Sequence, residues 1–110
     1  VNAAKTAAGV SSKETWDTES APISPTLNNY SDSEAMKLIA RSMLIMAARG
    51  ITRTCYYTYD SPTFGFINRQ PIKEYREQII KLLIGGTIKS VWQYTDGRVA
   101  YYTASGMTVI

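Results

Sequence analysis

Apolar positions along the chain follow a helical period in three segments. Residues 2–8 are rich in alanine and are followed by Gly9, a pattern typical of the end of a helix. Over residues 32–49, apolar side chains recur every three or four positions, which predicts an amphipathic helix with one broad buried face. A third helix is predicted over residues 72–84, with Pro71 at its first position.

The ends of the long second helix carry specific signals. Ser31 and Glu34 have the spacing of a capping box, in which each side chain accepts a hydrogen bond from the backbone of the other. Gly50 follows the last helical turn, where a left-handed residue ends the helix. On the two longer helices, the residues expected to face the core are Ala35, Leu38, Ile39, Ser42, Ile45, Met46, Tyr75, Ile79, Leu82 and Leu83.

Two further segments have the composition of strands. Residues 51–59 are rich in β-branched and aromatic side chains. Residues 13–20 alternate so that Trp16 and Thr18 share one face and the polar residues Thr15, Asp17 and Glu19 share the other. A polar, acidic strand face is typical of a strand that lines a cavity, so we expect one there.

The last part of the chain predicts an antiparallel meander. Three short strands are expected over residues 87–95, 98–104 and 107–110, joined by two-residue turns at Asp96-Gly97 and Ser105-Gly106. The order of elements therefore predicts an α/β protein with two parallel strands, followed by the meander. Because two parallel strands cannot form a covered sheet, we expect further sequence or a partner chain to complete it. The alternative is a small free-standing α+β domain in which residues 13–20 need not form a strand.

Composition removes several classes of function. The 110 residues carry a formal net charge of +3, one cysteine and no histidine, so Ser-His-Asp and Cys-His catalysis and histidine-based zinc sites are excluded within the chain. Lys and Arg are scattered, and no nucleic-acid partner is expected. No apolar run approaches the ~20 residues of a membrane helix, so no membrane partner is expected. We also expect no cofactor and no metal site.

Short motifs resemble a known family. Residues 2–60 resemble helix six to strand eight of a (β/α)8-barrel glycoside hydrolase of the large retaining clan, and members often continue into a β-sandwich. The resemblance implies that residues 1–84 are the C-terminal part of the barrel and that residues 85–110 begin a β-sandwich or β-meander. The motifs that carry it are Ala7-Ala8-Gly9, Trp16-Asp17-Thr18-Glu19, Ala48-Arg49-Gly50 and Tyr56-Tyr57-Thr58-Tyr59-Asp60.

The resemblance also implies roles for particular residues. Glu19 matches the strand-seven nucleophile, and its acid/base partner, on strand four of the family, is absent from this chain. The substrate-binding candidates implied at the barrel mouth and lumen are Trp16, Asp17, Tyr57, Tyr59 and Asp60. Each has a plainer interpretation: a solvated or ion-paired carboxylate for the acids, and ordinary strand or core packing for the aromatics. Asp17 with Glu19 is too small a set to indicate a metal.

The expected function is therefore the C-terminal part of a glycoside hydrolase that acts on or binds a polysaccharide or oligosaccharide, inactive as this chain alone. Its expected partners are the sugar and the remainder of the barrel, from missing sequence or from another chain. A secreted, cell-surface or virion setting is favoured, for example a phage tail. The alternative is a non-enzymatic structural or interaction module of a virion or surface assembly, in which the aromatic meander is a protein interface.

Overall fold

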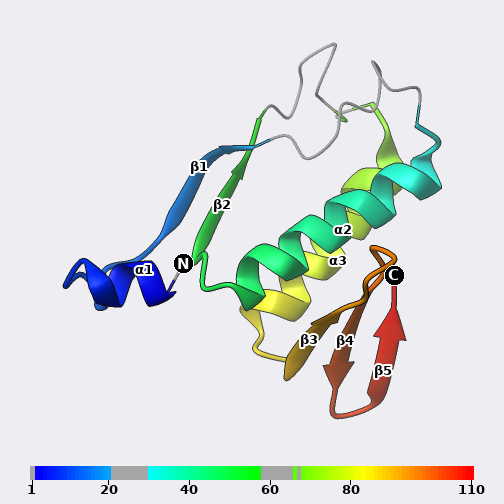
Figure 1. The fold of residues 1–110 in the computed structure, drawn as a ribbon. Helices are drawn as coiled ribbons and strands as arrows, with labels where there is room; N and C mark the ends of the chain where they lie inside the picture. The colour runs from blue at the N-terminus through cyan, green and yellow to red at the C-terminus, as the bar shows by residue number, and fades with distance from the viewer. Residues whose placement is uncertain (1, 21–29, 58–65, 67) are drawn as a thin grey trace.

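The computed structural model describes residues 2–20, 30–57, 66 and 68–110. Within these residues each of the predicted helices and strands is present (Figure 1). The elements in chain order are α1 (Asn2–Ala7), β1 (Trp16–Ser20), α2 (Asp32–Ala48), β2 (Arg53–Tyr56), α3 (Gln70–Ile84), β3 (Ser90–Gln93), β4 (Val99–Thr103) and β5 (Gly106–Val109).

Both ends of α2 form as predicted. The backbone N–H of Glu34 donates to Ser31 Oγ at 3.3 Å, and the N–H of Ser31 donates to Glu34 Oε2 at 3.0 Å, which completes the capping box. At the other end Gly50 has φ 82°, which glycine adopts without steric cost. The N–H of Ile51 then reaches back to the carbonyl of Met46 at 3.0 Å, as in a Schellman motif. This motif turns the chain directly from α2 into β2.

The strands β1 and β2 are parallel neighbours, as predicted. Trp16 pairs with Arg53, and α2 makes the crossover between the two strands. A parallel pair with a helical crossover is a βαβ unit. In Figure 1 the two arrows run side by side, with α2 and α3 on one side of them. The described residues form no third strand in this sheet.

The predicted alternation of β1 is wrong beyond Asp17. Asp17 pairs with Thr54 and Ser20 pairs with Tyr56, so β1 advances three residues while β2 advances two. Paired residues share a face of a sheet, and Thr54 and Tyr56 share the face toward the helices. Ser20 therefore lies on the same face as Asp17, and Glu19 does not. The cause is an irregularity in pairing, which a period-two pattern cannot anticipate.

The C-terminal strands form a separate antiparallel sheet in the order β3-β4-β5. The meander was predicted, but both turns differ in detail. The N–H of Tyr94 donates to the carbonyl of Arg98 at 2.9 Å, which makes the first loop three residues long, and Gly97 takes the left-handed position with φ 89°. Thr103 pairs with Gly106, so the second loop is Ala104-Ser105.

Two apolar clusters form the core, and α2 contributes to both. The first lies between α2, the start of α3 and Phe66, and the second lies between α2, α3 and the meander. Ala40 and Leu44 are buried although the predicted stripe omitted them, whereas Ser42, Ile45 and Met46 are partly exposed. The buried residues of the two clusters are Ala35, Ile39, Phe66 and Ile72, and Ala40, Leu44, Ile79, Val99 and Ile110.

The described residues therefore form a mixed α/β structure with a parallel pair and an antiparallel meander, consistent with a small α+β arrangement. After α3 the chain enters the meander and does not return beside β2 (Figure 1). The closed barrel stays a prediction. None of the described helices is both long enough and apolar enough to span a membrane.

The capping box gives the first testable prediction. Replacing Ser31 with Ala leaves the N–H of Glu34 without its side-chain acceptor, and we expect a loss of about 1 kcal/mol in the free energy of unfolding. The matched control is Ser33→Ala, an exposed position in the same turn whose hydroxyl has no capping role. Urea unfolding followed by circular dichroism measures both, and equal losses for the two variants would contradict the assigned cap.

Candidate functional site

One face of the parallel pair has no described element packed against it. Thr54 lies on the helix side, where its Oγ1 is 3.7 Å from the sulfur of Met46. Strand alternation then directs Arg53, Cys55 and Tyr57 to the opposite side, which we call the open face.

Glu19 lies at the carboxyl end of β1 and is exposed. The N–H of Tyr57 donates to the carbonyl of Ser20 at 2.7 Å, so the carboxyl ends of β1 and β2 are joined directly beside it. The side chain of Tyr57 is 44% exposed. The structure thus places Glu19 and Tyr57, two of the predicted site residues, at the adjoining carboxyl ends of β1 and β2.

Trp16 occupies the other end of the open face. It begins β1, three positions before Glu19, and a strand rises about 3.3 Å per residue, which separates the two by roughly 10 Å. Trp16 is 54% exposed, and the guanidinium carbon of Arg53 lies 4.5 Å from the centroid of its ring. Trp16 is therefore not gathered with Glu19, although both were predicted to serve one site.

A carboxylate completes the arrangement around Trp16. The indole N–H donates to Glu14 Oε2 at 2.7 Å, and the Nε of Arg53 lies 3.4 Å from the same oxygen. The sequence reasoning missed both Glu14 and Arg53. The spacing of Glu14 two positions before Trp16 was a usable signal, because such residues share a strand face. Arg53 could be found only from the register between β1 and β2.

Asp17 faces the helices rather than the open face. Its Oδ2 and the Oγ of Ser20 are both buried, and neither has a hydrogen-bond partner among the described residues. Buried polar atoms are almost always paired, so the Asp17 oxygen calls for a donor, and the Ser20 hydroxyl for a donor or an acceptor, among groups other than the described ones. Asp17 and Glu19, which were predicted to act on one face, are separated by the irregular pairing of β1.

Two further candidate residues from the sequence analysis are not described by the structure. Tyr59 and Asp60 lie outside the described residues. Among the residues that are described, no three of the His, Cys, Asp and Glu side chains are arranged to hold a metal ion.

Comparisons with known proteins gave no match to a family model, to a curated protein or to a solved structure.

The cluster around Trp16 gives a pH prediction. The hydrogen bond from the Trp16 indole, and next the charge of Arg53, hold the pKa of Glu14 below its ordinary value of 4.5. A lowered pKa means that the contact stabilises the folded chain at neutral pH and is lost as the pH falls through the folded pKa. We expect the fluorescence of Trp16, measured in a Trp92→Phe background, to change in an acid transition below pH 4.5.

The control is Glu14→Gln, which keeps the shape of the side chain and removes its charge. This variant should lack the acid transition while its circular dichroism at neutral pH stays unchanged. A transition of the same size in the variant would assign the change to another group.

Proposed function

We propose that this chain forms the last two βα units of a (β/α)8-barrel glycoside hydrolase, with the other strands supplied by further sequence or by a partner chain. Parallel pairing of β1 with β2 through a helical crossover supports this proposal, because it is the repeating unit of such a barrel. Both helices of the unit lie on one side of the strands, as helices do on the outside of a barrel (Figure 1). The meander then begins an accessory β-domain.

The position of Glu19 carries the proposal. In barrel enzymes the active site is built from residues at the carboxyl ends of the strands. Glu19 is at that end of β1, exposed, and on the other side of the strand from Ser20 and the helices. The irregular pairing of β1 thus favours a carboxylate directed into the lumen. Strict alternation from Asp17 would have turned Glu19 toward α2.

In this proposal a Glu19 oxygen attacks the anomeric carbon of a bound sugar. A bond forms between that oxygen and the carbon while the bond to the leaving oxygen breaks, and an acid from the remainder of the barrel protonates the leaving oxygen. Water then attacks the anomeric carbon, its proton passes to the carboxylate that had protonated the leaving oxygen, and the bond to Glu19 breaks. The acid must stand about 5 Å from Glu19, and Tyr57 at the adjoining strand end offers an aromatic surface to the sugar ring.

The test uses the protein that contains this chain together with the rest of the barrel. A panel of 2-deoxy-2-fluoroglycosyl fluorides that differ in the sugar should trap the covalent intermediate, since the fluorine slows its hydrolysis. Mass spectrometry of the digested protein should then locate the added sugar on Glu19. Glu19→Gln should lower glycosidase turnover by on the order of 10³-fold or more.

Glu14→Gln is the matched control, because Glu14 is an exposed carboxylate at the opposite end of the same face. It should keep its turnover and its labelling. Labelling of a different carboxylate, or full turnover in Glu19→Gln, would remove Glu19 from the mechanism and with it the assignment.

A second candidate function, a structural or interaction module, is favoured by the outer face of the meander. Trp92, at 61% exposure, and Val109 flank Ala100 across the three strands. Beside them Tyr102 pairs with Met107, and both are exposed. This outer apolar face is on the opposite side of the sheet from Tyr101, which packs toward the core. Contiguous exposed apolar side chains of this kind are typical of protein interfaces.

If this face joins copies of the chain in an assembly, the mass in solution depends on Trp92. We expect sedimentation velocity to show species heavier than the 12.2 kDa chain, and Trp92→Lys to shift them to the monomer. Gln93→Lys adds the same charge at the next, also exposed, position and should leave the assembly intact. A wild-type chain that is monomeric at every concentration would end this second candidate.

A further inference from the structure

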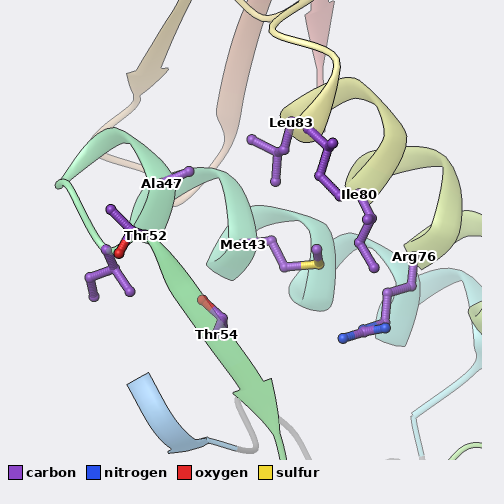
Figure 2. Close-up of a pocket in the computed structure, with 9 residues that line it drawn as sticks. Met43, Ala47, Thr52, Thr54, Arg76, Ile80 and Leu83 are labelled. Atoms are coloured by element: carbon purple, nitrogen blue, oxygen red, sulfur yellow. The ribbon is translucent and has the colours of Figure 1, made fainter. Parts of the chain in front are cut away.

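A polar pocket lies beside the meander. It is bounded by α2, α3, β5 and the turn before β4, and its volume of about 310 Å³ is at the small end of the ligand pockets of proteins. The polar residues in its lining are Lys37, Arg41, Tyr75, Arg98 and Thr108. A different cavity, lined largely by apolar side chains such as Met43 and Ile80, lies beside β2 (Figure 2). That cavity belongs to the barrel proposal, which places its next strand beside β2.

Every charged side chain that lines the pocket beside the meander is basic. Lys37 and Arg41 lie four positions apart on one face of α2, and Arg98 comes from the turn before β4. No acidic side chain is among the described residues of the lining. Like charges at this spacing on a helix repel one another and destabilise it. An anion seated between the three cations would remove that cost.

Arg41 is held in a fixed position at the pocket. It is half-buried, and its Nε donates to the carbonyl of Ile110 at 2.9 Å. The ion pairs of the described residues involve Arg53, Arg69 and Arg98, and none of them includes Arg41. A guanidinium that is fixed by one hydrogen bond presents its other donors in a set plane, which suits the oxygens of an oxyanion.

Lys37 is only partly balanced by its neighbour Glu34. Side-chain and backbone hydrogen bonds from Ser31 are the main cause that lowers the pKa of Glu34, and the charge of Lys37 contributes least. Both Ser31 bonds go to Oε2 of Glu34, so this carboxylate is engaged in the capping box. Lys37 therefore keeps a positive charge that a ligand in the pocket can use.

The turn before β4 positions Arg98. The side chain of Asp96 accepts from the backbone N–H of Arg98 at 3.0 Å and from its Nε at 2.8 Å. The guanidinium carbon also lies 4.9 Å from the centroid of the Tyr94 ring. Because Asp96 balances its charge, Arg98 contributes directed N–H donors more than net charge. The uncompensated charge of the pocket is that of Lys37 and Arg41.

We propose that this pocket binds the phosphate group of a small phosphate monoester. Such a group carries close to two negative charges at neutral pH, which matches the two unpaired cations Lys37 and Arg41. Its oxygens also accept hydrogen bonds from Arg98 and from the hydroxyl groups of Tyr75 and Thr108, which line the same pocket. The site uses neither Glu19 nor the rest of the barrel, so it stands or falls separately from the glycosidase proposal.

Tyr75 favours an ester over free phosphate. Burial, and next the neighbouring Tyr101, raise the pKa of the Tyr75 hydroxyl above its ordinary value of 10.0, so the hydroxyl is a donor at neutral pH. The half-buried ring offers an apolar surface to the group that carries the phosphate. Inorganic phosphate has no such group and gains only the polar contacts.

The experiment titrates phenyl phosphate into the 110-residue chain at about pH 7.5, where the ligand is a dianion, and follows the Arg41 Nε–H and Thr108 amide signals by NMR. The chain carries a C-terminal amide, because a free carboxylate on Ile110 would itself lie beside Arg41. In about 0.1 M salt we expect both signals to saturate with a dissociation constant of about 1 mM or less. Glucose 6-phosphate should behave in the same way, and inorganic phosphate should bind about threefold more weakly.

Four variants locate the site. Lys37→Gln should weaken the binding of phenyl phosphate by about fivefold, and Arg41→Gln by about tenfold or more. Tyr75→Phe keeps the ring and should weaken binding by about threefold. Lys81→Gln removes the same charge at an exposed position of α3 outside the pocket and should change binding by less than about twofold. Amide spectra of each variant without ligand verify that it is folded.

Several outcomes would overturn the proposal. Absence of saturation at about 20 mM phenyl phosphate, or equal losses in Lys37→Gln and Lys81→Gln, would mean that the pocket is not an anion site. Acetate or methyl phenyl phosphate, each with a single negative charge, might be expected to bind at least tenfold more weakly, and equal binding would make the ligand a monoanion such as a carboxylate. Inorganic phosphate that binds as tightly as both esters would exclude the ester.

Discussion

Burial of apolar side chains along α2 is the interaction on which the rest of the structure depends. Ala35 and Ile39 anchor one cluster and Ala40 and Leu44 the other, so both parts of the core meet on this one helix. The small side chains of the two alanines let neighbouring elements approach closely. The same helix links the parallel strands, and its capped ends direct the chain into and out of them. Loss of packing on α2 would therefore disrupt both apolar clusters at once.

The two sheets depend on α2 in different ways. The meander places Val99 and Ile110 in the core and is fastened by Arg41, whose Nε donates to the carbonyl of Ile110 at 2.9 Å. The parallel pair has backbone hydrogen bonds but presents Thr52 and Thr54 to the helices, where buried parallel strands normally present Val, Ile or Leu. The parallel pair therefore presents smaller and more polar side chains to the helices than a buried parallel sheet does.

Local signals in the sequence predicted the elements well, because a capping box or a glycine after a helix acts within a few residues. Parallel pairing of β1 and β2 also followed from the order of elements. Three features could not be predicted from the sequence. They are the face of β1 on which Glu19 lies, the contact between Trp16 and Arg53, and the burial of Leu44. Each depends on how two distant segments are aligned, and a pattern read along one segment carries no information on that alignment. Tyr59 and Asp60 remain predictions from resemblance.

The irregular pairing of β1 has a consequence for how this region tolerates change. Between Asp17 and Ser20, β1 has one residue more than regular pairing with β2 allows. Because of this extra residue, Asp17 faces the helices and Glu19 faces solvent. Deleting a residue between Asp17 and Ser20 would exchange the surroundings of every side chain downstream in the strand, without altering any of their identities. Insertions and deletions in this short stretch should therefore be rarer among functional variants than substitutions. The number of residues in the stretch, more than their identity, decides which face of the strand each side chain occupies.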